Sequence, residues 1–99
     1  MLAVLGTFRF PPVNIAAARP LMADVIAQTL KEPGCLAYSY AQDVADPGLF
    51  HVSERWTDRA ALTAHFQTGH MIAWAKARAE LGFGDRRICL YQIGEVESL

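Results

Sequence analysis

Three histidines, two arginines, one glutamate and one tryptophan fall within twenty residues of this 99-residue chain, in the stretch HVSERWTDRAALTAHFQTGH at positions 51–70. Such groups could bind a metal, exchange protons with a substrate, or only brace a core. The spacing argues against a metal. No HxH or HExxH pattern is present. His65 and His70 are five residues apart, about 140° around a regular helix, and a predicted helix break at Gly69 lies between them. We therefore expect no metal site and no bound cofactor.

Other chemistries have weaker signals. There is no Gly-x-Ser-x-Gly elbow and no phosphate-binding glycine loop. Cys35 and Cys89 fall in predicted strands, so we expect free thiols. The net charge of −1 and scattered basic residues predict no nucleic-acid partner. No apolar run approaches the roughly 20 residues that span a bilayer, and the N-terminus lacks a basic leader, so we expect no membrane association and a cytoplasmic location.

The elements that must position these residues follow from hydrophobic spacing. Alternation predicts strands at residues 2–10, 35–43, 49–56 and 86–96. Helical spacing predicts helices at 19–31, 59–67 and 70–81, with an irregular turn before the first because of Pro20, and with Asn14 as an N-cap. The order β-α-β-β-α-β is that of a ferredoxin-like α+β fold, a four-stranded antiparallel sheet with helices on one face, in a single domain over residues 1–99.

The uncovered face of this predicted sheet is too apolar to face water alone. The chain is 53% hydrophobic and only 19% charged, which also suggests apolar surface covered by a partner. We expect a homodimer formed through the sheets. The residues assigned to this face are Ala3, Leu5, Cys35, Ala37, Tyr91 and Ile93, beside Thr7, Arg9, His51 and Arg55.

The helix-facing side carries the candidate site. Alternation places Tyr38, Tyr40, Glu54 and Trp56 there, and a buried carboxylate needs a partner, for which His65 or a tyrosine hydroxyl is available. Either these groups brace the helices on the sheet or they line a cavity. His70 and Trp74 share a helical face with Phe66, and the small residues Ala73 and Ala77 beside Trp74 would leave room for a flat ligand, although core packing alone also explains Trp74.

The stretches EPGCLAYSY, DPGLFHVSERW and ALTAHFQTGH together resemble the antibiotic biosynthesis monooxygenase domain, over roughly residues 2–93. The resemblance implies a dimeric α+β barrel of two ferredoxin-like chains, with a pocket between sheet and helices. It also implies a monooxygenase that oxidises a quinol-like or polycyclic phenolic substrate with O2 and needs no cofactor. His70 or His65 would be the base, and Glu54 would orient a histidine. The substrate-binding residues would be Trp74, Trp56, Tyr38, Tyr40 and Phe66.

Other activities remain open at this point. Relatives of this fold that degrade haem use an asparagine, a tryptophan and a histidine where this chain has Thr7, His65 and Ala75, so haem degradation is disfavoured. The same pocket could serve a non-oxidative isomerase or decarboxylase acting on a small metabolite. It could also serve a dimer that binds a small ligand without chemistry.

Overall fold

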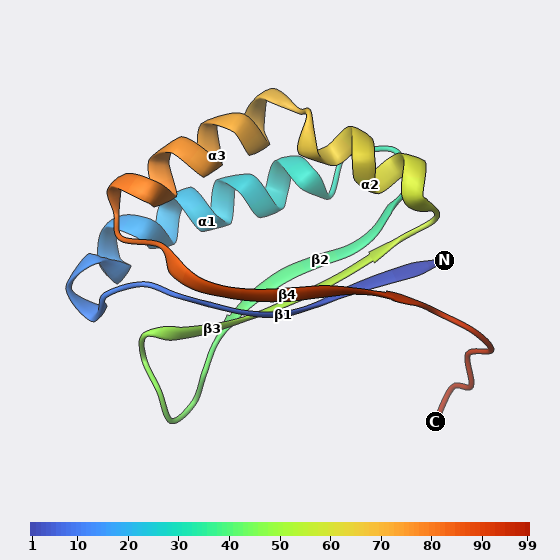
Figure 1. The fold of residues 1–99 in the computed structure, drawn as a ribbon, viewed down its shortest axis with the longest axis horizontal. Coiled ribbons are helices and arrows are strands. Elements are labelled where there is room, and N and C mark those ends of the chain that lie inside the picture. The colour runs from blue at the N-terminus through green and yellow to red at the C-terminus, as the bar shows by residue number, and fades with distance from the viewer.

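The computed structural model describes residues 1–99 and has the predicted ferredoxin-like α+β architecture, with the three helices on one face of a single sheet (Figure 1). The sheet order is β2-β3-β1-β4 and every pair is antiparallel. None of the helices combines the length and apolarity needed to cross a membrane. In chain order the elements are β1 (Leu2–Arg9), a 3-10 turn (Pro12–Asn14), α1 (Ile15–Thr29), β2 (Cys35–Gln42), β3 (Leu49–Trp56), α2 (Arg59–Phe66), α3 (Gly69–Glu80) and β4 (Gly84–Gln92).

The core lies between the helices and the sheet in two groups of buried side chains. Alternate residues of β1 and β3 point to the helices, as the pleat of a strand requires. One group lies under α1 and α3 around Phe8, Phe10 and Phe50. The other lies under α2 around Trp56, which is completely buried. The candidate site lies where these two groups meet.

The first helix begins earlier than predicted, at Ile15, and contains Pro20. Proline removes one backbone hydrogen bond, yet the 3-10 turn leads directly into α1, and Ile15 and Ala18 are buried against the sheet. Packing of this first turn therefore outweighs the local cost of proline. Asn14 occupies the N-cap position, but its side chain instead donates from Nδ2 to the carbonyl oxygen of Leu81 at 2.9 Å, after the end of α3.

A bulge in β2 changes the face assigned to Cys35. The pairing with β3 shifts between Cys35 and Ala37, so Leu36 has no partner across the ladder. Cys35 consequently packs against the group around Trp56 on the helix side, while Leu36 is exposed. The prediction that Cys35 lies on the uncovered face is wrong, because a bulge interrupts the alternation on which it depended.

No part of the chain covers the other face of the sheet (Figure 1). Leu5 of the inner strand β1 is 44% exposed there, and Tyr91 of the edge strand β4 is 51% exposed, which is a large exposure for big apolar side chains on one sheet face. Gly6, in the central strand, allows β4 to come close, since a Cβ at this position would lie 2.0 Å from the carbonyl oxygen of Arg87.

Candidate functional site

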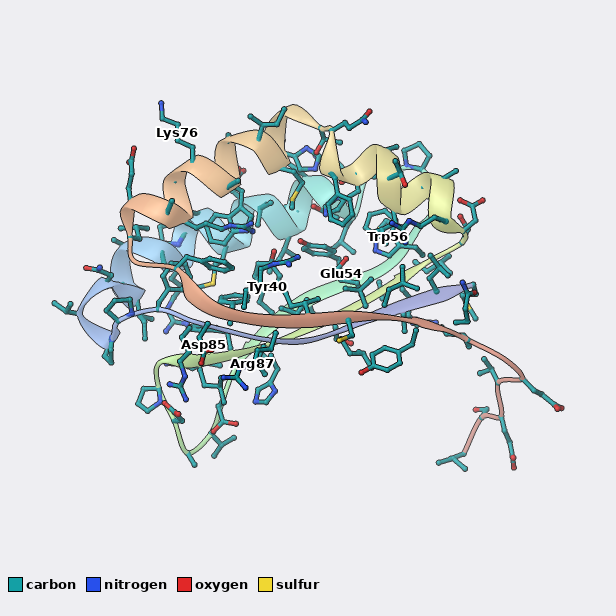
Figure 2. The ribbon with its side chains drawn as sticks, viewed as in Figure 1. Tyr40, Glu54, Trp56, Lys76, Asp85 and Arg87 are labelled. Atoms are coloured by element: carbon teal, nitrogen blue, oxygen red, sulfur yellow. The ribbon has the colours of Figure 1, made fainter.

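A small polar cavity lies between the sheet and helices α2 and α3. Its volume is about 30 Å³, room for one or two water molecules. Tyr40 and Glu54 rise from the sheet toward the helices in this region (Figure 2). The lining residues are Phe8, Tyr38, Tyr40, Val52, Glu54, His65, Phe66, Met71, Arg78, Phe83, Arg86 and Ile88.

Glu54 is the most unusual group in the cavity. It is only 6% exposed, and its Oε1 accepts a hydrogen bond of 2.9 Å from Nε1 of Trp56, two residues along the same face of β3. Burial raises the pKa of Glu54 to about 7, although the Trp56 hydrogen bond and the charge of Arg86 oppose this rise. The partner predicted from sequence, His65 or a tyrosine, is wrong. A carboxyl with this pKa can take up or release a proton near neutral pH.

Two tyrosines of β2 form the wall beside Glu54. Their hydroxyl oxygens are 2.6 Å apart, so one donates to the other. Burial raises the pKa of both Tyr38 and Tyr40, which keeps both hydroxyls protonated and able to donate hydrogen bonds. The ring of Tyr40 stacks on Trp74 with centroids 6.3 Å apart, and Nε1 of Trp74 is buried near the Tyr40 hydroxyl without forming a hydrogen bond of good geometry.

Two arginines complete the cavity, and sequence reasoning missed both. Arg78 of α3 places its guanidinium 4.3 Å from the ring centre of Phe83, and burial lowers its pKa. Arg86, at the start of β4, is exposed. Arg86, Phe66 and Ile88 also line an adjoining groove of about 140 Å³ between α2 and β4. Alternation along β4 could have identified Arg86 as helix-facing, since Ile88 and Leu90 follow it at intervals of two.

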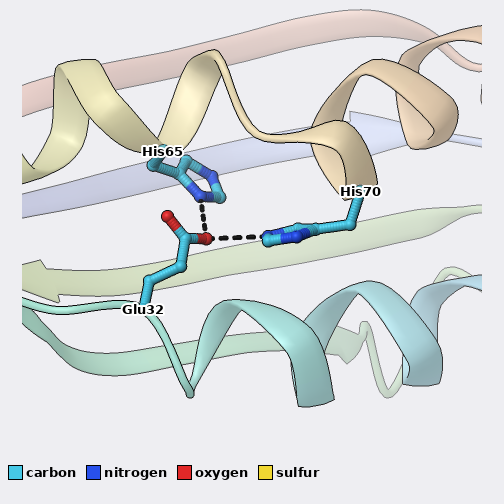
Figure 3. Close-up of side chains that lie close together, drawn as sticks. All are labelled: Glu32, His65 and His70. Atoms are coloured by element: carbon cyan, nitrogen blue, oxygen red, sulfur yellow. Dashed lines mark hydrogen bonds and ion pairs between the residues drawn. The ribbon is translucent and has the colours of Figure 1, made fainter.

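His65 and His70 both bind Glu32, a residue of the turn after α1 that sequence reasoning did not identify as part of the site. Oε2 of Glu32 accepts from Nδ1 of His65 at 2.7 Å and from Nε2 of His70 at 2.8 Å (Figure 3). The side chains of these residues are 11%, 1% and 13% exposed, in that order. Burial lowers the pKa of His65, and the carboxylate of Glu32 opposes this change.

Local structure explains why these three groups meet. Gly34 of the EPG turn has φ of 83°, and a Cβ there would lie 2.6 Å from Cβ of Ala61, so the turn lies directly against α2. Thr68 separates α2 from α3: its Oγ1 donates to the carbonyl oxygen of His65 and accepts from the backbone N–H of Met71. The helix axis changes at this break, and both imidazoles reach one carboxylate. The 140° separation expected for an unbroken helix does not apply.

The predicted site residues are thus divided between two places. The cavity brings together Tyr38, Tyr40, Glu54, His65 and Phe66, with Trp56 behind Glu54. His70 and Trp74 instead line a separate groove of about 140 Å³ between α1 and α3. Ala73 and Ala77, which were expected to leave room for a ligand, also line this outer groove.

Comparison with known proteins gives a consistent family. The sequence pattern of the family "Antibiotic biosynthesis monooxygenase" matches residues 1–77. An uncharacterised protein of Synechocystis sp. is 30% identical over 98 residues, which span 99% of this chain and 67% of that protein. A candidate antibiotic biosynthesis monooxygenase from Deinococcus radiodurans has a crystal structure that matches with a TM-score of 0.93 and 27% identity, over 100% of this chain and 98% of that one. A second crystal structure, of an antibiotic biosynthesis monooxygenase, matches with a TM-score of 0.88 and 33% identity, over 96% and 100% of the chains.

Proposed function

The chain belongs to the antibiotic biosynthesis monooxygenase family, and we propose that it is a cofactor-independent monooxygenase that oxidises a quinol-like or phenolic substrate with O2 in the cavity around Glu54. The observation that carries the proposal is a buried carboxyl whose pKa is about 7, set among protonated tyrosines and two arginines. A phenol loses its proton to such a base, and the resulting phenolate is electron-rich enough to pass an electron to O2.

The residues of the cavity have complementary roles in this proposal. Glu54 accepts the phenolic proton. One of the Tyr38 and Tyr40 hydroxyls donates to the other, and the second donates a hydrogen bond to the phenolate oxygen. Arg78 and Arg86 stabilise the negative charge that moves onto oxygen. For a hydroquinone, one oxygen atom of O2 enters the ring and the other leaves as water, so hydroquinone and O2 give hydroxyquinone and water, and the ring supplies all four electrons.

His65 contributes a further hydrogen-bonding group. Its Nδ1 donates to Glu32, and its Nε2 forms no hydrogen bond within the protein, while the ring lines the cavity. In the proposal, Nε2 of His65 accepts a hydrogen bond from the second hydroxyl of the substrate, and Glu32 fixes the ring that does so. His70 does not line the cavity, so it supports His65 through Glu32 and is not the base.

The substrate must open the cavity further, because about 30 Å³ cannot hold an aromatic ring. Phe66 is 51% exposed, Arg86 is also exposed, and both line the cavity and the adjoining groove of about 140 Å³. Displacement of these two side chains would join the two spaces. This favours a single-ring quinol, since a polycyclic phenol would also require α2 and α3 to move.

A homodimer is part of this proposal. The exposed apolar side chains of Leu5 and Tyr91 on the uncovered face suit a second copy of the sheet. The variant Tyr91→Glu should then sediment as a monomer at concentrations where the wild type sediments as a dimer. A wild-type protein that is monomeric at high micromolar concentration would contradict the dimer without affecting the cavity.

Oxygen uptake with a panel of hydroquinones, under 18O2, tests the reaction. The wild type should consume O2 faster than the protein-free background and incorporate one labelled atom into the product. Glu54→Gln should abolish this, whereas Glu80→Gln, an exposed glutamate of α3, should not. Product without label, with hydrogen peroxide formed instead, would show an oxidase and refute monooxygenation.

The small size of the cavity favours one alternative, a non-oxidative isomerase or decarboxylase acting on a small carbonyl metabolite. Glu54 would then remove a proton next to the carbonyl group. Turnover in the absence of O2 separates this alternative from the oxygenase. Ligand-induced thermal stabilisation without turnover under either condition would identify a binding protein.

A further inference from the structure

We propose that Glu32, His65 and His70 form a binding site for one divalent transition-metal ion, with zinc as the representative ion. One ligand atom from each residue lies within 4.8 Å of the other two. The three residues come from the turn after α1, from α2 and from the start of α3, and their side chains converge on one point (Figure 3). The sequence spacing led us to expect no metal, because Glu32 lies 33 residues from His65 along the chain and was not considered as a ligand.

The donor set suits this class of ion. Two imidazole nitrogens and one carboxylate oxygen are ligands that zinc and its neighbours in the first transition row accept, with one or more positions left for water. Two neutral histidines and one carboxylate carry a single negative charge, which a divalent cation more than balances. All three side chains are at least 87% buried, which limits competition from solvent while leaving an approach open.

The geometry needs only modest adjustment. Ligands of a tetrahedral zinc ion lie roughly 3.3 Å from one another when their bonds are about 2.0 Å long. The oxygen of Glu32 is 2.7 Å from Nδ1 of His65 and 2.8 Å from Nε2 of His70, so each of these separations must lengthen slightly. The two nitrogens, which lie within 4.8 Å of each other, must come to roughly 3.3 Å as well. Rotation of the long Glu32 side chain and of His70 in the first turn of α3 can supply both changes.

Metal binding does not require a net loss of protons. Without metal, the protons lie on Nδ1 of His65 and Nε2 of His70, because both nitrogens donate to the carboxylate. With metal, each ring carries its proton on the other nitrogen. For His65 this is Nε2, on the ring that lines the cavity. The ion would therefore convert His65 from an acceptor into a donor toward the cavity, a consequence that rests on the proposed function, whereas the binding itself does not.

An ion can reach the site from solvent. Glu32 lines an open depression of about 390 Å³ together with Gly34, Asp58 and Thr68, beside the N-terminus of α2. His70 lines the groove between α1 and α3 on the other side. Neither route passes through the cavity around Glu54, so metal binding can be measured without substrate and independently of any oxygenase activity.

The test uses the untagged full chain, stripped of metal, titrated with Zn²⁺ by calorimetry and with Co²⁺ by visible absorption. We expect one equivalent to bind with a Kd of about 10 µM or tighter. Glu32→Gln and His70→Gln should weaken binding at least about tenfold, while His51→Gln, the matched control on the opposite face, should bind like the wild type. Equal affinity in His70→Gln and the wild type, or loss of binding in His51→Gln, would overturn the proposal.

A second measurement covers the case in which a variant fails to fold. X-ray absorption of the wild type with one equivalent of zinc should show two imidazole ligands with bonds of about 2.0 Å. A first shell with fewer than two imidazoles, or the absence of stoichiometric binding, would refute the site directly. Neither result bears on oxygen uptake, so failure of this proposal and failure of the proposed function are distinguishable.

Discussion

Glu54→Gln should stabilise the folded protein in alkaline solution and have the opposite, smaller effect in acid. The pKa of Glu54 is about 7 in the folded chain against an ordinary value of 4.5. A carboxyl whose folded-state pKa is raised binds its proton more tightly when folded, so the free energy of unfolding falls as the pH rises from 4.5 to 7. This difference in pKa corresponds to about 3 kcal/mol of stability. That stability is fully present below pH 4.5 and completely lost above pH 7.

Glutamine at position 54 removes this loss of stability at high pH, because its side chain carries no charge to bury. Its Oε1 can still accept from Nε1 of Trp56, as Glu54 does at 2.9 Å. Its amide N–H groups need acceptors in the small cavity, and an unmet donor costs about 1 kcal/mol. We therefore expect a gain of about 2 kcal/mol at pH 8.5 and a loss of about 1 kcal/mol at pH 4.5.

Urea unfolding of both proteins at the two pH values, at one fixed protein concentration, measures this difference. Arg86 and Glu32 act on Glu54 from β4 and the turn after α1. The tyrosines of β2, His65 of α2 and Arg78 of α3 line the same cavity. These groups are present in both wild type and variant, so the effect of their titration largely cancels in the difference between the two free energies of unfolding. Glu80→Gln, on the surface of α3, should show no such pH dependence. An equal effect of Glu54→Gln at both pH values would refute a raised pKa, and with it the role of Glu54 as a base near neutral pH.

Three further outcomes follow from the same contacts. Gly6→Ala should lower the free energy of unfolding by several kcal/mol, on the order of a core disruption, because its Cβ would collide with the backbone of β4. Gly94→Ala, which has open space around it, should be nearly neutral in the same urea unfolding measurement. Trp56→Phe removes a donor that lowers the pKa of Glu54, so the lower limb of the pH–rate profile should move to higher pH; an unchanged profile would refute the proposed base. Asp58→Ala removes the N-cap of α2 and should cost about 1 kcal/mol in thermal unfolding, with Asp58→Asn retaining most of the stability.

The fold was predictable because its signals are local. The bounds of β3 match the prediction, since the Asp-Pro-Gly turn precedes this strand and the cap residue Asp58 follows shortly after it. Four of its eight residues alternate into the core. The start of α1 was not predictable from local preference, because Pro20 argues against a helix there and only burial of Ile15 and Ala18 stabilises it. The bulge at Leu36 has no sequence signal that we can identify.

The site was only partly predictable, because some of its contacts join residues close in the sequence and others do not. Alternation along β3 placed Glu54 among the helices, and the structure has it buried. Its hydrogen bond to Trp56 joins two residues on one face of one strand, so that partner was within reach of sequence reasoning. Glu32 was not, because it lies 33 residues from His65 and 38 from His70 along the chain, and only the packing of the turn against α2 brings them together.

The pairing of β1 with β4 has a consequence for how the protein is made. The central strand near the N-terminus takes its second neighbour from the far end of the chain, with Leu2 opposite Gln92. Ribosomal synthesis delivers the β1–β3 pair early, but one edge of the central strand stays unsatisfied until almost the last residue of β4 has emerged. Closing so long a loop is entropically slow, so the nascent chain exposes a strand edge that chaperones or premature self-association would meet first.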